Sequence, residues 1–534
     1  MVVTLYYMKP SPFTRPVLLT MKALGVTLEL KEVNTFKGEQ LKPEFVAINP
    51  QHTVPTLVDG DLTVCESKAI CTYLIAKHGK DDDPLYPRDP KVRARVDSLL
   101  YFDMGTLWSR FSAYFFPIRS GKATPEASQE SLGKFHEALG WLDGFLTRGR
   151  FAAGTDHVTV ADLVLVANVS GFEAGGLLPD KYRNIRAWLD RCKSEVAGYE
   201  EANGEGVKFF GEFVKSTLQG AETRKKTSGG SDVPEGVSQG QNAPPLDVDV
   251  MIKSRPCENG VRTNSVYVIT LMKVYVLWLC SVPDCVQGHP DMADYYQKTP
   301  VNGRTYSVPL FHQCLLRTTA RMTIDFYYFL PSPFCRSVLL TARALGLNLN
   351  LKETNVWEGD QKKSEFVALN PQHSVPTLVD GDLTLWESRA ICTYLASRYG
   401  KDDSLYPQDP KVRARVDGLL YFDMGTLWPR FRNTLSANPT QESLDKFHEA
   451  LGWLDGFLGR GRFAAGTDHV TVADHVLVAN VASFEAAGRL PGTHQQIGAW
   501  LERCKREMPG YEEANGKGAK RLAERLRATL GGGS

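Results

Sequence analysis

Residues 44–74 read EFVAINPQHTVPTLVDGDLTVCESKAICTYL, and residues 365–395 read EFVALNPQHSVPTLVDGDLTLWESRAICTYL. In each stretch two short apolar runs flank an Asp-Gly turn, which predicts a β-hairpin, and the residues after Glu-Ser predict a helix. The repetition extends further: YYMKPSPFTRPVLLTMKALG at 6–25 returns as YYFLPSPFCRSVLLTARALG at 327–346. The repeat is longer than the roughly 20–50 residues of a solenoid unit, so each copy is expected to be a complete globular protein.

Both copies have the same predicted order of elements. In the first, an apolar strand at 3–8 leads to a helix that closes at Gly25, and a second strand at 26–33 precedes the hairpin and its helix. After a proline-rich joint at 81–90, long amphipathic stretches predict only helices. We therefore predict a small α/β domain followed by an all-helical domain, repeated twice. The predicted domains are α/β at 1–80 and 323–401, all-helical at 88–218 and 408–530, and a linker at 219–322.

The segment 219–322 has no counterpart in either copy. It opens with a stretch rich in Gly, Ser, Pro and charge, which predicts disorder, and then turns apolar over Val266–Val282. That run contains Lys273 and is at the short limit for a membrane helix, so we predict no membrane span. Met322 precedes the second YY motif as Met1 precedes the first. One hypothesis is therefore that two adjacent genes and spurious intervening sequence are joined in one reading frame; the alternative is a tandem protein with a long linker.

The composition argues against several classes of function. Lys and Arg (62) nearly balance Asp and Glu (61), so no net field recruits nucleic acid or an anionic membrane. The ten cysteines show no CxxC pair and no Cys/His spacing suited to a metal, and nothing indicates a disulfide framework. The N-terminus lacks the pattern of a signal peptide. We therefore expect a cytoplasmic protein without nucleic-acid, membrane or metal partners.

Ser11 and Ser332 occupy positions suited to chemistry. Each follows a predicted strand and a proline and precedes a predicted helix. A hydroxyl at that place can face a helix N-terminus, where free N–H groups and the helix dipole favour an anion. A thiol bound there would be held as thiolate. The alternative is that each serine is an ordinary N-cap.

Two further motifs follow each serine. Val54–Pro55 and Val375–Pro376 begin a predicted strand, where a cis proline would turn backbone groups outward to pair with an extended, peptide-like ligand. Glu66–Ser67 and Glu387–Ser388 open the next helix, a second N-terminus suited to a carboxylate. The alternatives are a trans proline and ordinary capping, with the basic residue after Glu-Ser simply solvated.

Taken together, the fragments SPF-x-R, NPQH-x-VPTLVDGDL and ES-[KR]-AI, followed by an all-helical half, resemble the glutathione transferase family. The resemblance is strongest to the arthropod delta and epsilon classes and covers both copies from end to end. It implies a thioredoxin-like N-terminal domain and an all-α C-terminal domain in each copy. It also implies that glutathione is conjugated to electrophiles.

Residue by residue, the resemblance assigns Ser11 and Ser332 as the catalytic hydroxyls that stabilise the glutathione thiolate. Val54 and Val375 would pair through their main chains with the cysteinyl unit, beside cis prolines. The histidines of NPQH would lie near the glycyl end, and the ES-[KR] residues would hold the γ-glutamyl end. The implied glutathione-binding residues are His52, Val54, Pro55, Glu66, Ser67, Lys68, His373, Val375, Pro376, Glu387, Ser388 and Arg389.

A chemical argument favours transfer over thiol-disulfide exchange. Thioredoxin-like redox proteins carry CxxC at the turn that here reads Ser-Pro-Phe-Thr (11–14) and Ser-Pro-Phe-Cys (332–335). A serine forms no mixed disulfide, so glutathione itself becomes nucleophile and co-substrate, and we expect no other cofactor. Cys335, present in one copy only, is interpreted as a packing residue. Gln40 and Gln361 stand where many delta-class enzymes have a histidine, which weakens one implied glutathione contact.

The copies differ where the electrophile is expected to bind. After Trp108 the first copy continues RFSAYFFPIRSGKATPEASQESLGKF, whereas the second is shorter and lacks the aromatic residues at 114–116. At the ends of the copies, VKFFGEFVKSTL corresponds to AKRLAERLRATL. The predicted electrophile-binding residues are Trp108, Phe111, Tyr114, Phe115, Phe209, Phe213, Trp428 and Phe431. The alternative is that they are helix core; as a pocket, they predict bulky apolar electrophiles for the first copy and a narrower range for the second.

Two other functions fit the same motifs. One is a non-catalytic binding or scaffold module of this fold, and the other is isomerisation or dehydrohalogenation with glutathione unconsumed. Both copies keep the serine and the Val-Pro pair, which favours conjugation, the transfer of alkyl or aryl groups in detoxification. Members of the resembled family usually dimerise, so we expect either an internal pseudo-dimer of the two copies or pairing between separate chains.

Overall fold

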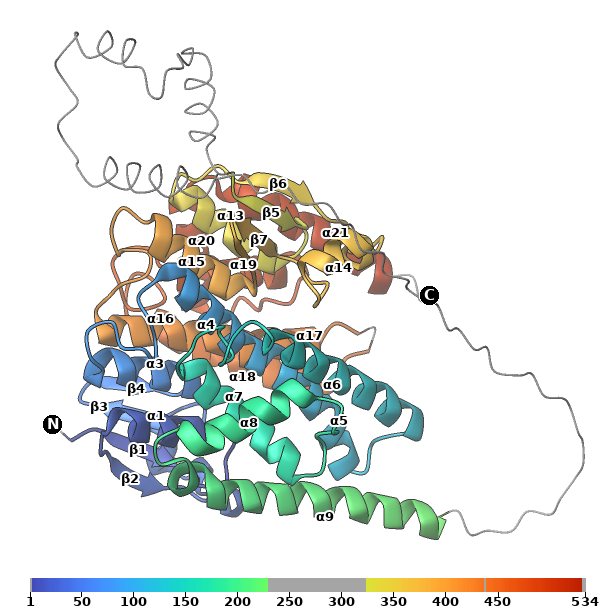
Figure 1. The fold of residues 1–534 in the computed structure, drawn as a ribbon. Helices are drawn as coiled ribbons and strands as arrows, with labels where there is room; N and C mark the ends of the chain where they lie inside the picture. Colours follow the sequence, from blue (N-terminus) through green and yellow to red (C-terminus); the bar gives the residue numbers. More distant parts are fainter. Residues whose placement is uncertain (1, 229–322, 437, 531–534) are drawn as a thin grey trace, which may run out of the picture. The chain divides into compact units, whose positions relative to one another are not determined.

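A mixed four-stranded sheet opens each copy (Figure 1). In the first, β1 (Thr4–Tyr7) lies between parallel β2 (Glu29–Glu32) and antiparallel β3 (Thr56–Asp59), and β4 (Leu62–Val64) pairs with β3. The second sheet has the equivalent order β6 (Asn350–Glu353), β5 (Asp325–Tyr328), β7 (Thr377–Asp380) and β8 (Leu383–Trp386). This computed structural model describes residues 2–228, 323–436 and 438–530.

The helices of the α/β domains alternate with these strands. α1 ends before Gly25, whose φ of 66° is a left-handed conformation that glycine adopts without steric cost. α1 packs against α3, and α13 packs against α15. The helices are α1 (Arg15–Leu24), α2 (Pro43–Val46), α3 (Ser67–His78), α13 (Pro333–Ala344), α14 (Ser364–Leu369) and α15 (Ser388–Tyr399). Short 3₁₀ turns lie at η1 (Thr35–Lys37), η2 (Glu39–Leu41) and η5 (Asp360–Lys362).

The second domain of each copy is helical throughout its described residues, which confirms the predicted fold class. In the first copy the elements are α4 (Pro90–Phe102), π-helical η3 (Asp103–Trp108), α5 (Ser109–Arg119), α6 (Pro125–Phe145), α7 (Val160–Ala174), α8 (Arg183–Glu195), π-helical η4 (Glu200–Gly204) and α9 (Glu205–Ser228). In the second they are α16 (Pro410–Phe422), π-helical η6 (Asp423–Leu427), α17 (Trp428–Arg432), α18 (Gln441–Leu458), α19 (Val472–Ala486), α20 (Gln495–Glu507), π-helical η7 (Glu512–Gly516) and α21 (Lys517–Leu530).

Helix α9 corrects one predicted boundary. We placed the start of the linker at residue 219, whereas α9 continues to Ser228. The sequence from 219 to 228 contains Gln, Ala, Glu, Arg and Lys, which are good helix formers, and the next two residues are glycines. The composition of the segment predicted a linker from residue 219, but the helix propensity of residues 219–228 extends α9 into it. The rest of that segment, including Val266–Val282 and Met322, lies outside the described residues.

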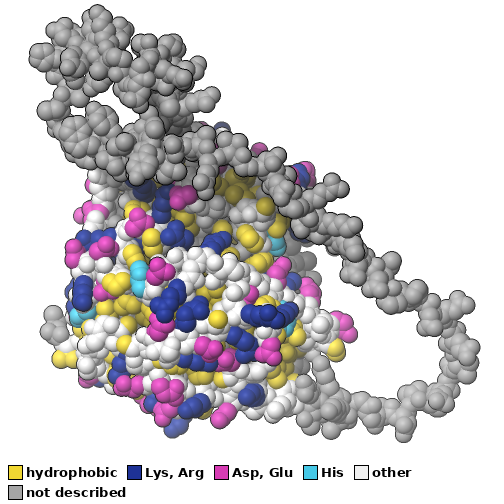
Figure 2. Space-filling view, viewed as in Figure 1, with side chains coloured by type: hydrophobic (Ala, Val, Ile, Leu, Met, Phe, Trp, Pro, Cys, Tyr) yellow, Lys and Arg dark blue, Asp and Glu magenta, His cyan; other side chains and the backbone are white. Residues whose placement is uncertain are grey.

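The surface carries both signs of charge. On the face shown in Figure 2, basic and acidic side chains are intermixed over the described part of the chain. A mixed surface of this kind does not create the extended field of one sign that attracts a polyanion. In the ranges that the structure describes, no helix has both the length and the apolar content needed to cross a membrane.

The two copies contact each other through equivalent elements. α4 packs against α15, and α16 packs against α3 in the same way. The rings of Tyr101 and Tyr421 stack at 4.7 Å between centroids. The hydrogen bonds between the copies include two matching ones, from Thr72 Oγ1 to Asp417 at 3.1 Å and from Thr393 Oγ1 to Asp97 at 3.2 Å. The helix contacts and the Thr–Asp hydrogen bonds occur twice with the copies exchanged, and the tyrosine stack joins two equivalent residues. This is the pattern of a two-fold, self-complementary interface.

Small residues let the two π-helical segments approach each other. η3 and η6 are in contact. A Cβ added to Gly105 would lie 2.5 Å from Cε of Met424, and one added to Gly425 would lie 2.7 Å from Cε of Met104. Each methionine therefore occupies the space that the glycine of the other copy leaves.

Candidate functional site

Strand pairing brings the serine turn and the Val-Pro turn to the same end of each sheet. β1 and β3 are antiparallel with Tyr6 opposite Thr56, so the end of β1 meets the start of β3. Ser11 follows β1, and Val54–Pro55 directly precedes β3. The second copy repeats the arrangement, with Tyr327 opposite Thr377. Two motifs that are far apart in sequence therefore converge because of strand order.

The two serine hydroxyls differ in how they meet the helix that follows. The carbonyl oxygen of Ser11 accepts from the N–H of Arg15 at 3.1 Å, and its Oγ accepts a hydrogen bond from the backbone N–H of Phe13 at 3.3 Å, as in an N-cap. Ser332 is the N-cap residue of α13, but its side chain makes no capping hydrogen bond. Both serines are half-buried. The alternative of an ordinary side-chain N-cap is therefore contradicted for Ser332, whereas Ser11 makes a hydrogen bond of that kind.

The fourth residue of each serine turn has a structural role. Thr14 Oγ1 accepts from the N–H of Met8 at 3.4 Å, and Cys335 Sγ accepts from the N–H of Phe329 at 3.3 Å. Burial raises the pKa of the Cys335 thiol to about 12, so it stays protonated and is a poor nucleophile at neutral pH. A buried acceptor of a backbone hydrogen bond agrees with the packing role inferred for Cys335.

Both predicted cis prolines are confirmed. The peptide bonds Val54–Pro55 and Val375–Pro376 are cis, and both valines are half-buried. The histidine two positions before each valine has a left-handed backbone, with φ of 46° at His52 and 42° at His373. This local geometry directs the histidine side chains toward the other copy.

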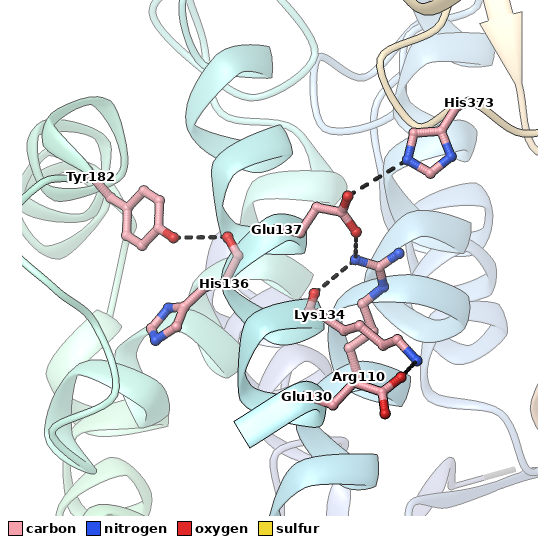
Figure 3. A network of polar contacts seen from close by, with 7 residues as sticks. All are labelled: Arg110, Glu130, Lys134, His136, Glu137, Tyr182 and His373. Carbon is pink, nitrogen blue, oxygen red and sulfur yellow. Dashed lines mark hydrogen bonds and ion pairs between the residues drawn. The ribbon is translucent and has the colours of Figure 1, made fainter. Parts of the chain in front are cut away.

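His373 contacts the first copy, as Figure 3 shows. Its Nε2 atom lies 3.5 Å from Oε1 of Glu137, whose other oxygen accepts from Arg110 at 2.6 Å. The imidazole packs edge-on against the ring of Trp141, with centroids 5.6 Å apart. The equivalent residues in the opposite sense are His52, Glu449, Arg430 and Trp453. Both histidines therefore contribute to the contact between copies, a role that the sequence did not indicate.

The basic residues after Glu-Ser form buried ion pairs. Lys68 Nζ lies 2.9 Å from Oδ2 of Asp103, and the Lys68 side chain is only 2 % exposed. In the second copy Arg389 pairs with Asp423 and is buried equally well. The alternative of a solvated side chain at these positions is therefore wrong. The assignment of Lys68 to the γ-glutamyl end is also revised, because its ammonium is engaged by a carboxylate of its own copy.

Asp103 and Asp423 are site residues that the sequence analysis missed. Each is fully buried at the first position of a π-helical segment, and Asn168 Nδ2 donates to Asp103 at 2.8 Å. Asn480 repeats this contact with Asp423. The available signal was an acidic residue inside YFDMGTLW, an apolar stretch repeated in both copies. A buried charge of this kind requires a cation as partner.

Glu66 and Glu387 precede the first turns of α3 and α15. Burial raises the pKa of each carboxyl to about 7, opposed by the neighbouring Lys68 or Arg389. The backbones differ, since φ is −99° at Glu66 and 70° at Glu387. Both carboxyls are therefore poised to change charge near neutrality, which suits a group that receives a ligand ammonium.

A cavity of about 570 Å³ brings together several predicted residues of the second copy. It is lined by Val375, Pro376, Glu387, Ser388, Arg389 and Trp428, with Trp108 from the first copy among the other lining residues. Among the described residues around it, Phe334 lines the cavity but Ser332 does not. Residues of the first copy thus form part of the wall of this cavity, next to the Val-Pro and Glu-Ser motifs of the second copy.

Three of the predicted electrophile-binding aromatics are core residues. Phe111, Phe115 and Phe431 are at most 1 % exposed, and Phe111 stacks on Phe115 at 5.3 Å. The prediction that these three residues line a pocket is therefore wrong, and the alternative, that they are part of the helix core, holds for them. Helical periodicity predicts an apolar face but not whether that face meets a ligand or another helix.

The remaining aromatics stay at least partly accessible. Trp108 contacts Phe13 at 4.8 Å, and Trp428 makes the matching contact with Phe334 at 5.0 Å, next to each serine turn. Tyr114 and Phe213 are half-buried, and Phe209 is 46 % exposed. Phe36, which the sequence analysis missed, lies 6.0 Å from Phe209 and 6.3 Å from Phe213. The first copy thus carries an aromatic cluster on its surface near α9.

Family models match the first domain of both copies and the helical domain of the first. Models described as "Glutathione S-transferase, N-terminal domain" match residues 5–82 and 322–397, and "Glutathione S-transferase, C-terminal domain" matches 125–191. Glutathione S-transferase D7 of Anopheles gambiae is 44 % identical over 218 residues, which are 40 % of this chain and 98 % of that protein. Glutathione S-transferase D7 of Drosophila melanogaster is 46 % identical over 210 residues, 39 % of this chain and 92 % of that one. A solved delta-class glutathione transferase of Nilaparvata lugens is 45 % identical. The match covers 40 % of this chain and 99 % of that chain, with a TM-score of 0.38.

The buried ion pair generates a test of stability. Lys68→Met should lower the free energy of unfolding by about 3–5 kcal/mol, because it leaves the Asp103 carboxylate buried without a cation. Lys68→Arg should retain most of the stability, because the second copy uses Arg389 at the same position. Thermal and denaturant unfolding of the intact chain measure both. Equal stability of Lys68→Met and the unaltered chain would contradict the role of the pair.

Proposed function

Since this chain belongs to the glutathione S-transferase family, we propose that each copy joins the glutathione thiolate to a small hydrophobic electrophile in a detoxification reaction. The observation that carries the proposal is the repeated convergence of two motifs. In each copy a half-buried serine lies at the sheet end where a cis Val-Pro turn begins the next strand. Glutathione is the co-substrate, and the reaction needs no further cofactor.

The mechanism relies on positioning and electrostatics. The main chain of Val54 or Val375 pairs with the extended cysteinyl unit of glutathione. The γ-glutamyl carboxylate meets the free N–H groups at the start of α3 or α15, and its ammonium faces Glu66 or Glu387. The serine hydroxyl donates a hydrogen bond to the thiolate sulfur, which lowers the thiol pKa. The thiolate attacks the electrophilic carbon, a C–S bond forms, and the leaving group departs with its electron pair.

The two copies should differ in the electrophiles that they accept. Phe36, Phe209 and Phe213 give the first copy an aromatic surface beside α9. In the second copy Trp357 stands at the position of Phe36, and the guanidinium of Arg525 lies 5.3 Å from its ring. The first copy also has a cation at this place, since the Arg119 guanidinium lies 5.2 Å from the Phe213 ring. The copies differ because Arg521 and Arg525 replace Phe209 and Phe213, and burying these charges against a bulky apolar group is costly. We therefore assign broad apolar specificity to the first copy.

The repeated contacts between the copies support an internal pseudo-dimer. Tyr101 stacks on Tyr421, and the Thr–Asp hydrogen bonds occur in both directions. We propose that the chain works in the cytoplasm as this internally paired unit. Glutathione and small electrophiles are its partners.

Substitution of the serines tests the catalytic assignment. Ser11→Ala and Ser332→Ala together should lower the turnover number roughly a hundredfold while leaving glutathione affinity nearly unchanged, because a hydrogen bond to the thiolate is lost. Each single variant should retain the activity of the other copy. Conjugation of a chromogenic electrophile and the ultraviolet absorbance of bound thiolate measure the effect. Undiminished turnover in the double variant would refute the role of the serines, and glutathione binding by the unaltered chain without turnover on any electrophile would indicate a scaffold.

The single variants also separate the specificities of the copies within one chain. Ser332→Ala reports mainly the first copy, and Ser11→Ala reports mainly the second. We expect Ser332→Ala to prefer a hydrophobic over a polar electrophile more strongly than Ser11→Ala does, as the ratio of kcat/KM values. Equal ratios would show that the aromatic cluster does not determine electrophile choice.

Glutathione binding should depend on pH through Glu66 and Glu387. Below about pH 7 these carboxyls are largely protonated and must lose a proton before they pair with the ligand ammonium. The affinity for S-methylglutathione, which has no titrating thiol, should therefore rise as pH increases to about 7 and level off above it. Calorimetric titration measures this, and Glu66→Gln with Glu387→Gln should flatten the profile. A flat profile in the unaltered chain would contradict the assignment.

A further inference from the structure

The two copies differ at one equivalent corner of their contact. The sequence after the β-hairpin reads VCES in the first copy and LWES in the second, so Cys65 and Trp386 occupy the same position. β8 packs against α4 of the first copy, and β4 packs against α16 of the second. Each of these two side chains therefore faces the helical domain of the other copy.

On one side, Trp386 fills the corner. Its ring lies 5.4 Å from that of Phe145, and the guanidinium of Arg148 lies 5.3 Å from the indole and 5.4 Å from the phenyl ring. Ser98 Oγ donates to the backbone oxygen of Trp386 at 3.2 Å. Trp386 is only 5 % exposed, and the space left beside it is about 20 Å³. Aromatic and cation–π contacts hold an indole here.

On the other side, the same helical framework is present without the indole. Phe457 and Arg460 stand where the first copy has Phe145 and Arg148, and the Arg460 guanidinium lies 5.1 Å from the Phe457 ring. Gly418 replaces Ser98, and a Cβ added there would meet no atom within 4 Å. With Cys65 in place of a tryptophan, the cavity is about 490 Å³.

This cavity adjoins the proposed glutathione site of the first copy and shares Glu66 with it. Glu66 lies at its edge, but Val54, Pro55 and Ser67 are not among the described residues that line it. Burial raises the pKa of the Cys65 thiol to about 12. Cys65 therefore lines the cavity as a neutral group and does not act as a nucleophile.

We propose that the cavity beside Cys65 binds a planar bicyclic aromatic molecule in the position that the Trp386 indole takes at the other corner. The second copy provides the face of the Arg460 guanidinium and the edge of Phe457. These are the counterparts of the groups that contact Trp386. A preformed cavity with aromatic side chains and two arginines, Arg415 and Arg460, in its wall selects a flat ring system. The first copy of the chain thus carries a ligand site where the second carries a side chain.

The two corners provide matched variants for the test. Indole is titrated calorimetrically into the full chain with S-methylglutathione saturating. Cys65→Trp should fill the cavity and remove one equivalent of bound indole, and Trp386→Cys should open the second corner and add one. Indole sites elsewhere are common to all three proteins and cancel in the comparison.

Melting temperatures establish that the variants are folded, and Cys65→Trp should melt higher because it fills the cavity. If Cys65→Trp binds as many equivalents of indole as the unaltered chain, the proposal is overturned, whatever the behaviour of Trp386→Cys. A folded Trp386→Cys that gains no equivalent would also overturn it, because the Trp386 pocket would then not describe an indole site.

Discussion

The buried pair of Lys68 and Asp103 is the constraint on which the arrangement of each copy depends. Lys68 lies in the first turn of α3, in the α/β domain, whereas Asp103 begins η3 in the helical domain and is held by Asn168 of α7. A carboxylate without access to water needs a cation close to it. The pair therefore fixes the distance between the helix start that is proposed to receive glutathione and the helices that carry the electrophile surface.

The sequence predicted what is encoded locally. The Asp-Gly hairpin and the order of strands and helices follow from motifs a few residues long, whereas the cis Val-Pro bonds were implied by the family resemblance. Partners distant in sequence were not predictable: nothing near Lys68 indicated that Asp103 would engage it. The burial of Phe111 was equally hidden, because a helical pattern does not say what the apolar face meets. At α9, composition suggested a linker although the individual residues favour a helix.

Comparison of the copies identifies the property that each position requires. Lys68 and Arg389 pair with equivalent aspartates, Asp103 and Asp423, so this position requires a buried cation in both copies. Thr14 and Cys335 occupy equivalent positions, and the side chain of each accepts a hydrogen bond from a backbone N–H. The requirement there is a small acceptor and not a thiol. By contrast, Cys65 and Trp386 share neither size nor chemistry. The contact between the copies is therefore open beside Cys65 and filled beside Trp386.

The reciprocal insertion of Met104 toward Gly425 and of Met424 toward Gly105 has a consequence for assembly. Because both halves of this contact belong to one covalent chain, their association is intramolecular and governed by an effective concentration instead of the concentration of the protein. In the internally paired unit that we propose, dilution does not shift this association, and every molecule contains one copy of each kind. Two separate polypeptides would also form pairs of two first copies or of two second copies. Within one chain, the pair always consists of one first copy and one second copy.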